Sequence, residues 1–408
     1  MEERTKVVDK KKGLWGNLLV RILIAIGLGI VCGNIFPLWA GRLFQTFGSI
    51  FSQFLGFLIP LLIVGFVAPA IADVGRKAGK VLIFTVLLAY LSTTCSGMMA
   101  FFVGDSLFPA MLTSKDGAVV SIESETAAIE PFFTIEMPPL MSVMTALVLA
   151  FVLGICMAYL KTPTLRSAAN EFRDIIAMTI GRAIIPLLPL YIFCIFLNIT
   201  ATGQVTPILS AFMKIIVVIF AMHIGLLLAQ YFIAAIFVKR NPLRMLLTIM
   251  PAYFTALGTQ SSAATIPVTL RQVIRMGVSE DIAGFTVPLC ATIHMSGSAM
   301  KIVSCAVALM IMQGLPYTTP MFLGFICMIG ITMVAAPGVP GGAIMAALGL
   351  LSSMLGFSEA DQALMIALYI AMDSFGTACN VAGDGAISLI VDRFFGNGRN
   401  PIPAEARL

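Results

Sequence analysis

Charged residues are scarce in this chain of 408 residues, where Asp, Glu, Lys and Arg together make up 11% of the sequence. A soluble domain carries about 25% charged residues. Hydrophobic residues make up 59% of the chain, which excludes an ordinary soluble domain. The composition predicts an all-α polytopic membrane protein, because a backbone surrounded by hydrocarbon must satisfy its own hydrogen bonds.

Several catalytic and metal-binding patterns are also missing. The eight cysteines stand singly in apolar runs, without C-x-x-C or Cys/His pairing, which is typical of packed small residues. No nucleotide-binding P-loop, metalloprotease helix or nucleophile elbow is present, so ATP-driven transport and hydrolysis within this chain are not expected. We expect no enzyme activity, no organic cofactor and no nucleic-acid partner.

Long apolar runs dominate the first part of the chain. Residues 1–14 are charged and lack a small-residue cleavage site, so the run that follows them is predicted to be a membrane helix and not a signal peptide. A spanning helix needs about 20 apolar residues. Six such helices are predicted near 15–36, 43–72, 80–104, 139–160, 175–199 and 206–238. Pro186 and Pro189 are expected to kink the fifth.

Lys and Arg alternate with acidic or uncharged loops between these helices. Basic residues precede the first helix and follow the second, fourth and sixth, whereas residues 105–138 are acidic and rich in proline. The positive-inside rule therefore places the N-terminus in the cytoplasm and residues 105–138 outside the membrane. Basic residues near the end of the chain place the tail, residues 396–408, in the cytoplasm as well, which requires an even number of crossings.

The pattern changes after residue 240. Residues 242–270 and 318–356 each contain two short apolar arms around a tip of small residues, and a helix with polar residues inside follows each, at 282–312 and 362–392. Two re-entrant hairpins in an inverted repeat would give this layout, which is typical of a transporter site at the bilayer midplane. The alternative is a Gly/Pro kink within ordinary spanning helices.

The last of these helices carries an unusual polar stripe. Asp373, Thr377, Asn380 and Asp384 stand at offsets of 0, 4, 7 and 11 in an otherwise apolar run, within an arc of about 60° on one helix face. Ionisable residues inside a membrane segment indicate function by default. Asp373 is a candidate for a substrate ammonium, and Asp384 with Asn380 for Na⁺. The alternative is a pair of hydrogen-bonded or helix-end carboxylates.

Two cationic candidates share a face of the 282–312 helix, because His294 and Lys301 are seven residues apart. His294 either carries a proton near neutral pH or is a neutral core histidine that donates to a carbonyl. Lys301 either pairs with a carboxylate such as Asp373 or extends to the outer interface. His223 has no polar neighbour at helical spacing, which favours a structural role.

Four motifs in order resemble the dicarboxylate/amino acid:cation symporter family: GTQSSAATIPVTL (258–270), FTVPLCATIHMSGSA (285–299), APGVPGGAIM (336–345) and NVAGD (380–384). This family contains glutamate transporters, neutral amino-acid exchangers and bacterial serine/threonine symporters. The resemblance implies eight transmembrane helices, two re-entrant hairpins, a homotrimer in a bacterial inner membrane, and elevator motion. The first, second, fourth and fifth helices would form a scaffold, while the third and sixth would join a transport core at 241–395.

The resemblance also assigns roles to single residues. The substrate-binding candidates are Ser261, Ser262, Ser298, Val339, Gly341, Asp373, Thr377 and Asn380. The candidates for sodium are Asn380, Asp384, Cys290, Thr292, His294 and a third-helix set of Tyr90, Thr93 and Thr94. His294 and Lys301 are the candidates for a proton or a fixed charge that replaces one sodium ion.

Departures from the family motifs guide the functional prediction. Dicarboxylate transporters place an arginine where this chain has Gly376, and some bacterial members have another where it has Gln260. A neutral amino acid such as serine, threonine or alanine is therefore favoured, although Lys301 would supply a cation for an acidic substrate. Ser296 replaces a motif aspartate, which predicts fewer sodium ions than usual. The predicted function is sodium-driven symport. The alternatives are a proton-coupled or exchange-mode carrier, and an anion channel or sensor.

Overall fold

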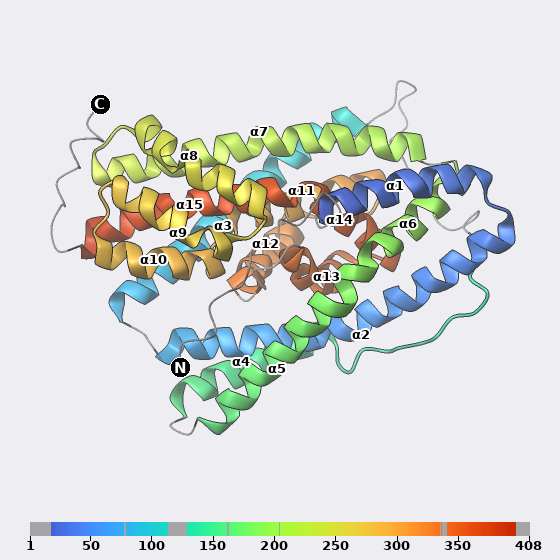
Figure 1. Cartoon of the computed structure of the whole chain (residues 1–408), viewed down its shortest axis with the longest axis horizontal. Helices are drawn as coiled ribbons and strands as arrows, with labels where there is room; N and C mark the ends of the chain where they lie inside the picture. Colours follow the sequence, from blue (N-terminus) through green and yellow to red (C-terminus); the bar gives the residue numbers. More distant parts are fainter. Residues whose placement is uncertain are drawn as a thin grey trace, which may run out of the picture.

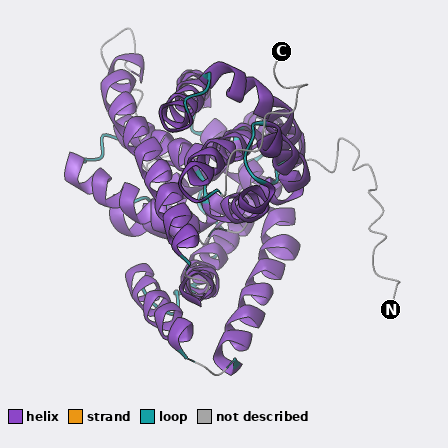
Figure 2. Ribbon diagram, turned by 90° about the vertical axis from the view of Figure 1, so that its left-hand side faces the viewer, coloured by secondary structure: helices purple, strands orange, loops and turns teal. Residues whose placement is uncertain are grey.

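The computed structural model describes residues 18–76, 79–112, 129–160, 163–203, 205–334, 336 and 341–396. Every regular element in these ranges is a helix and none is a strand (Figure 2). The elements in chain order are α1 (Leu18–Ile35), α2 (Leu38–Arg76), α3 (Lys80–Leu112), α4 (Val143–Tyr159), α5 (Thr164–Thr179), the π-helix η2 (Ile180–Ile184), α6 (Ile185–Ala201), α7 (Val205–Val238), α8 (Pro242–Thr259), α9 (Ser262–Arg275), α10 (Glu280–Ile293), α11 (Ser296–Met312), α12 (Thr319–Val334), α13 (Gly342–Leu355), α14 (Glu359–Ala371) and α15 (Asp373–Phe395).

The helices confirm a multi-pass membrane protein. Within the described residues, five spans are long and apolar enough to cross a bilayer: Leu38–Pro69, Lys80–Leu112, Thr164–Ala201, Ile208–Val238 and Glu280–Met312. The bent pair of α14 and α15 gives a sixth if it is counted as one span. α1 and α4 are shorter apolar helices of 18 and 17 residues.

One set of helices packs mainly within itself. α1 lies along α6, and α2 packs against α4, α5 and α6 (Figure 1). Close approach depends on small residues, because a Cβ at Gly29 of α1 would lie 2.8 Å from the Phe193 carbonyl oxygen, and one at Gly154 of α4 would lie 2.6 Å from Ile71 Cβ. Small residues at helix crossings let backbones pack tightly where no hydrophobic effect operates between helices in lipid.

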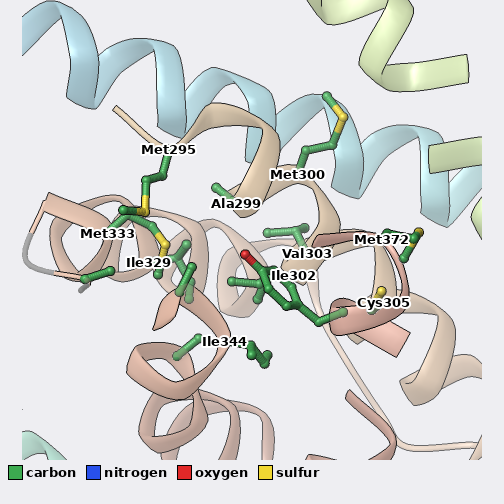
Figure 3. Close-up of a cluster of buried hydrophobic side chains, with 14 of the residues drawn as sticks. Met295, Ala299, Met300, Ile302, Val303, Cys305, Ile329, Met333, Ile344 and Met372 are labelled. Atoms are coloured by element: carbon green, nitrogen blue, oxygen red, sulfur yellow. The ribbon is translucent and has the colours of Figure 1, made fainter. Parts of the chain in front are cut away.

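The other helices assemble around α15. Helices α7, α8, α9, α10 and α11 all contact it, and α3 packs along α11 (Figure 1). Every residue of α11 except Ile311 is buried. Apolar side chains of α11, among them Ile302 and Val303, meet side chains of α12 and α13 in one cluster (Figure 3). α11 and α15 are thus the central elements, shielded from lipid by the surrounding helices.

Two helix boundaries differ from the sequence prediction. α3 extends to Leu112, so the loop predicted to begin at residue 105 begins later. Asp105 is tolerated within the helix because it is exposed and accepts a hydrogen bond from the Tyr317 hydroxyl at 2.8 Å. Residues 113–128 of that loop lie outside the described residues. The predicted fifth helix begins at Thr164 and not at 175, because α5 is amphipathic and lacks a continuous apolar run.

The proline distortion of this fifth span takes the form of η2, which ends immediately before Ile185 and Pro186. A proline lacks the N–H that would bond four residues back, and its ring crowds that carbonyl. A π-turn is one way in which a helix accommodates such a break in its hydrogen-bond ladder.

The two late helices predicted as continuous are both broken, which corrects the sequence prediction. The 282–312 helix separates into α10 and α11 at His294 and Met295, and the 362–392 helix separates into α14 and α15 with a bend of 63° at Met372. Side chains from other elements bond to backbone groups next to both breaks. Apolar periodicity does not reveal such breaks, because the side chains that bond to the backbone at each break are distant in the sequence.

We expect Gly29→Ala to lower the melting temperature of the purified protein, because the added methyl would press on the α6 backbone. Overpacking of this kind costs about 1–3 kcal/mol. The matched control is Gly27→Ala in the same helix, where a Cβ meets nothing within 4 Å. Equal melting temperatures for the two variants would contradict the tight α1–α6 crossing.

Candidate functional site

The polar stripe predicted from the sequence lies entirely on α15 and is buried. Asp373 and Asp384 are 5% and 1% exposed, and Thr377 and Asn380 between them are also buried. Eleven residues of helix place the two carboxylates about 16 Å apart along the axis. A buried carboxylate is costly unless it is paired. The groups that pair with Asp373 and with Asp384 therefore determine the structure at the two ends of the stripe.

Asp373, the first residue of α15, pairs with Lys301 of α11. The Lys301 ammonium lies 3.4 Å from Asp373 Oδ1, donates to the Met372 carbonyl oxygen at 3.2 Å, and stands 3.7 Å from the centroid of the Tyr369 ring. Asp373 Oδ2 accepts the backbone N–H of Gly341 at 2.8 Å. Of the two alternatives for Lys301, the structure therefore shows the carboxylate pair, with the lysine fully buried.

Gly376 provides the space in which the lysine lies. A Cβ built on Gly376 would overlap Lys301 Cε and come within 2.5 Å of Nζ. Any larger side chain at this position would push the ammonium away. Lys301 of α11 thus fills the space beside Gly376 on the neighbouring helix α15.

Asn380 joins α15 to the break between α10 and α11. Its Oδ1 accepts the N–H groups of Gly297 and Ser298 at 2.8 and 3.3 Å, and its Nδ2 donates to Ser298 Oγ at 3.0 Å. These N–H groups belong to the first turn of α11, where no intrahelical acceptor is available. The side chain of Asn380 therefore caps α11 from the neighbouring helix.

Asp384 pairs with His294, which lies in the same break. His294 Nδ1 is 2.9 Å from Asp384 Oδ1, and its Nε2 is 3.0 Å from Ser92 Oγ on α3. Gln230 of α7 donates to Ser92 Oγ and to Ser296 Oγ at 3.0 and 3.1 Å. Four helices thus meet in one largely buried polar network. The two ring nitrogens of His294 contact Asp384 and Ser92, and not a backbone carbonyl as expected for a neutral core histidine.

The third-helix set does not gather at this network. The Tyr90 hydroxyl donates to the Cys327 carbonyl oxygen of α12 at 3.3 Å, and a Cβ at Gly330 of α12 would lie 2.8 Å from Thr94 Oγ1. Tyr90 and Thr94 therefore face α12. The buried Thr93 hydroxyl has no hydrogen-bond partner within the described part of the chain.

The two candidates that precede His294 have different surroundings. Cys290 is fully buried, and its carbonyl oxygen accepts the His294 N–H at 2.8 Å. The Thr292 side chain is exposed and donates to the Leu289 carbonyl oxygen at 2.7 Å. The structure therefore keeps Cys290 beside the network and separates the Thr292 side chain from it.

The hairpin tips are less directly connected to the stripe. Ser261 caps α9 by accepting the Ala264 N–H at 3.3 Å, and Ser262 begins that helix, which packs against α15. Thr377 donates to the carbonyl oxygen of Asp373 in its own helix at 3.0 Å. Val339, predicted at the second tip, lies outside the described residues, whereas the N–H of Gly341, two positions later, donates to Asp373 Oδ2.

Sequence reasoning missed three polar residues of the network. Ser92 and Gln230 bond to each other and to the α10–α11 break, and Ser96 donates to the Ser296 carbonyl oxygen at 2.7 Å. Gln230 was detectable as an amide in an apolar run, but serines in membrane helices commonly bond their own backbone. His223, expected to be structural, lies 3.2 Å from the Gly297 carbonyl oxygen through Nε2.

The donor set suits small ions and zwitterions more than transition metals. Among the described residues, no three His, Cys, Asp or Glu side chains gather as metal ligands do. The site instead offers carboxylate, amide and hydroxyl oxygens, which hard cations prefer. A cavity of about 190 Å³ lies elsewhere, between α2 and α13–α14, and contains none of the stripe residues.

Comparison with known proteins agrees with this arrangement. A model of the sodium:dicarboxylate symporter family matches residues 18–394. The chain belongs to this family. It is also 27% identical over 389 residues to the serine/threonine transporter SstT of Bifidobacterium adolescentis, an alignment that covers 90% of this chain and 87% of the relative. The family resemblance drawn from the four motifs is therefore confirmed, and a sodium-coupled symporter family implies a small-molecule substrate.

Removing one partner of the Lys301–Asp373 pair should destabilise the protein more than removing both. Lys301→Met leaves a buried carboxylate unpaired, a loss of about 3–5 kcal/mol for such pairs. The double variant Lys301→Met/Asp373→Asn removes both charges, and we expect it to recover most of that loss. Thermal unfolding of the two single variants and the double variant measures this coupling, and additive losses would contradict it.

Proposed function

We propose that this protein is a secondary-active symporter that carries small neutral amino acids, of the serine, threonine or alanine type, with sodium. The observation that carries the proposal is Asp373, a buried carboxylate placed where α14, α15 and the second hairpin meet. A family member named for serine and threonine supports the substrate class, and so does Gly376 in place of the arginine of dicarboxylate transporters.

In this proposal, Asp373 binds the substrate ammonium, while Thr377, Asn380 and Ser298 supply the adjoining polar groups. Ser261, Ser262, Val339 and Gly341 contribute from the two hairpin tips. The bond from the Gly341 N–H to Asp373 Oδ2 supports a role for the second hairpin as a gate, because this contact couples its position to the substrate carboxylate. Substrate then enters when the hairpin moves away from α15.

Sodium binds at the other end of the stripe in this proposal, with Asp384, Asn380 and backbone groups near Cys290 and His294 as ligands. The His294 contact to Asp384 Oδ1 occupies one of the carboxylate oxygens. That contact, together with Ser296 in place of an aspartate, supports fewer sodium ions per cycle than is usual in the family. Tyr90, Thr93 and Thr94 remain a weaker candidate set.

The architecture we propose has eight crossings and two re-entrant hairpins, α8–α9 and α12–α13. The packing of α1, α2, α4, α5 and α6 on one another supports a scaffold, against which α3 and α7–α15 move as an elevator. We further propose a homotrimer in a bacterial inner membrane, with both termini in the cytoplasm.

We expect Asp373→Asn to abolish sodium-driven serine uptake in proteoliposomes, because an amide cannot hold the substrate ammonium as a carboxylate does. Uptake by the unchanged protein should fall to background when choline replaces sodium outside. Asp174→Asn is the control, since that carboxylate is exposed on α5 with 70% side-chain accessibility. Uptake retained by Asp373→Asn would refute the assignment of the substrate site.

One alternative has a specific observation in its favour, which is the contact of His294 with Asp384 where the family motif has asparagine. A proton-coupled or exchange-mode carrier would take up amino acid without sodium and would respond to an inward pH gradient. It would also lose activity in His294→Ala. We expect instead that uptake requires sodium at every pH tested, and sodium-independent, pH-driven uptake would favour the alternative.

A further inference from the structure

The Lys301–Asp373 pair joins a lysine and a carboxylate that are both buried, with side-chain accessibilities of 0% and 7%. A charge removed from water needs partners that replace its hydration. Lys301 has three of them, namely Asp373 Oδ1, the Met372 carbonyl oxygen and the Tyr369 ring.

The contact between the two charges is the longer of the two hydrogen bonds that Lys301 donates. Lys301 Nζ stands 3.4 Å from Asp373 Oδ1, whereas charge-assisted hydrogen bonds are typically about 2.7–2.9 Å long. Asp373 Oδ2, by contrast, is held by the Gly341 N–H at 2.8 Å. A substrate group bound between the ammonium and Oδ1 would therefore replace the longest of these hydrogen bonds, while Oδ2 stays available to the Gly341 N–H once the second hairpin has closed.

We propose that Lys301 is a substrate-binding residue, and that the Lys301–Asp373 pair is a receptor for a zwitterion. The inference rests on the proposed function. The substrate ammonium binds Asp373 Oδ1, and the substrate carboxylate binds the Lys301 ammonium, so that one loose ion pair is replaced by two. From Asp373 through the substrate ammonium and the substrate carboxylate to Lys301, each charge then lies next to a charge of opposite sign.

Charge balance determines which ligands this receptor accepts. Lys301 and Asp373 together carry no net charge, and a neutral amino acid adds none, so each buried charge keeps an opposite neighbour. An amine without a carboxylate would leave Lys301 facing only neutral groups, which is costly in a dry site. An acidic amino acid would add a second carboxylate without a second cation. Gly376 is required because a side chain there would displace Lys301.

Equilibrium binding to the purified full-length protein in sodium tests the inference. The ligands are L-serine and serinol, in which a hydroxymethyl group replaces the carboxylate, together with L-aspartate. We expect the unchanged protein to prefer serine over serinol by a factor on the order of 10 to 100, as for a hydrogen bond to a charged group. Lys301→Gln should abolish this preference, because it weakens the binding of serine and removes the unpaired lysine that disfavours serinol. Lys301→Arg should retain part of the preference.

The control is Lys214→Gln, because Lys214 is an exposed lysine of α7 whose ammonium donates to the Met111 carbonyl oxygen. It should leave the preference unchanged. Should Lys301→Gln fail to fold, the ratio of serine to serinol affinity is measured in Gly376→Ala instead. The added methyl would push the Lys301 ammonium aside, so we expect a reduced preference for serine.

Two results would overturn the inference. If Lys301→Gln, or Gly376→Ala in its place, weakens serine and serinol by the same factor, Lys301 is structural only. If the unchanged protein prefers aspartate and the lysine variant loses that preference, Lys301 binds a side-chain carboxylate instead. Failure of the proposed function differs from both, because the unchanged protein would then show no sodium-dependent binding of serine.

Discussion

Two carboxylates buried on one helix are the constraint on which the rest of this protein depends. Asp373 and Asp384 lie where hydrocarbon or packed side chains would otherwise surround them, and an unpaired charge there is prohibitively costly. Lys301 and His294 provide the partners, and both come from the α10–α11 segment. That segment must therefore lie along α15, and α3, α7, α8, α9, α12 and α13 cover the remaining faces of the two.

The helix breaks have the same physical origin. Ending a helix inside a membrane leaves backbone N–H and C=O groups without partners. Here, Asn380 caps the start of α11, Ser96 donates to the Ser296 carbonyl oxygen, and Lys301 donates to that of Met372. The side chains that line the candidate site therefore also stabilise its backbone, so that substitutions in the site are expected to affect both stability and transport.

Much of the fold was predictable because membrane helices leave a strong apolar signal. The runs that became α1, α2, α3, α4 and α7 were found close to their observed positions, and the motifs of the second half gave the family. The amphipathic α5 was missed, because its polar face interrupts the apolar run. The helix breaks at His294 and Met372 were also missed, since the groups that stabilise them are far away in the sequence.

The sequence by itself determined that the chain is helical and membrane-embedded, and that Asp373, Thr377, Asn380 and Asp384 share one helix face, because both facts depend on local composition and helical periodicity. Only the tertiary structure decided which charges meet. Lys301 and Asp373 are separated by 72 residues, and His294 and Asp384 by 90. Pairing over such separations depends on how helices pack, and packing also placed Gly376 where the lysine needs room.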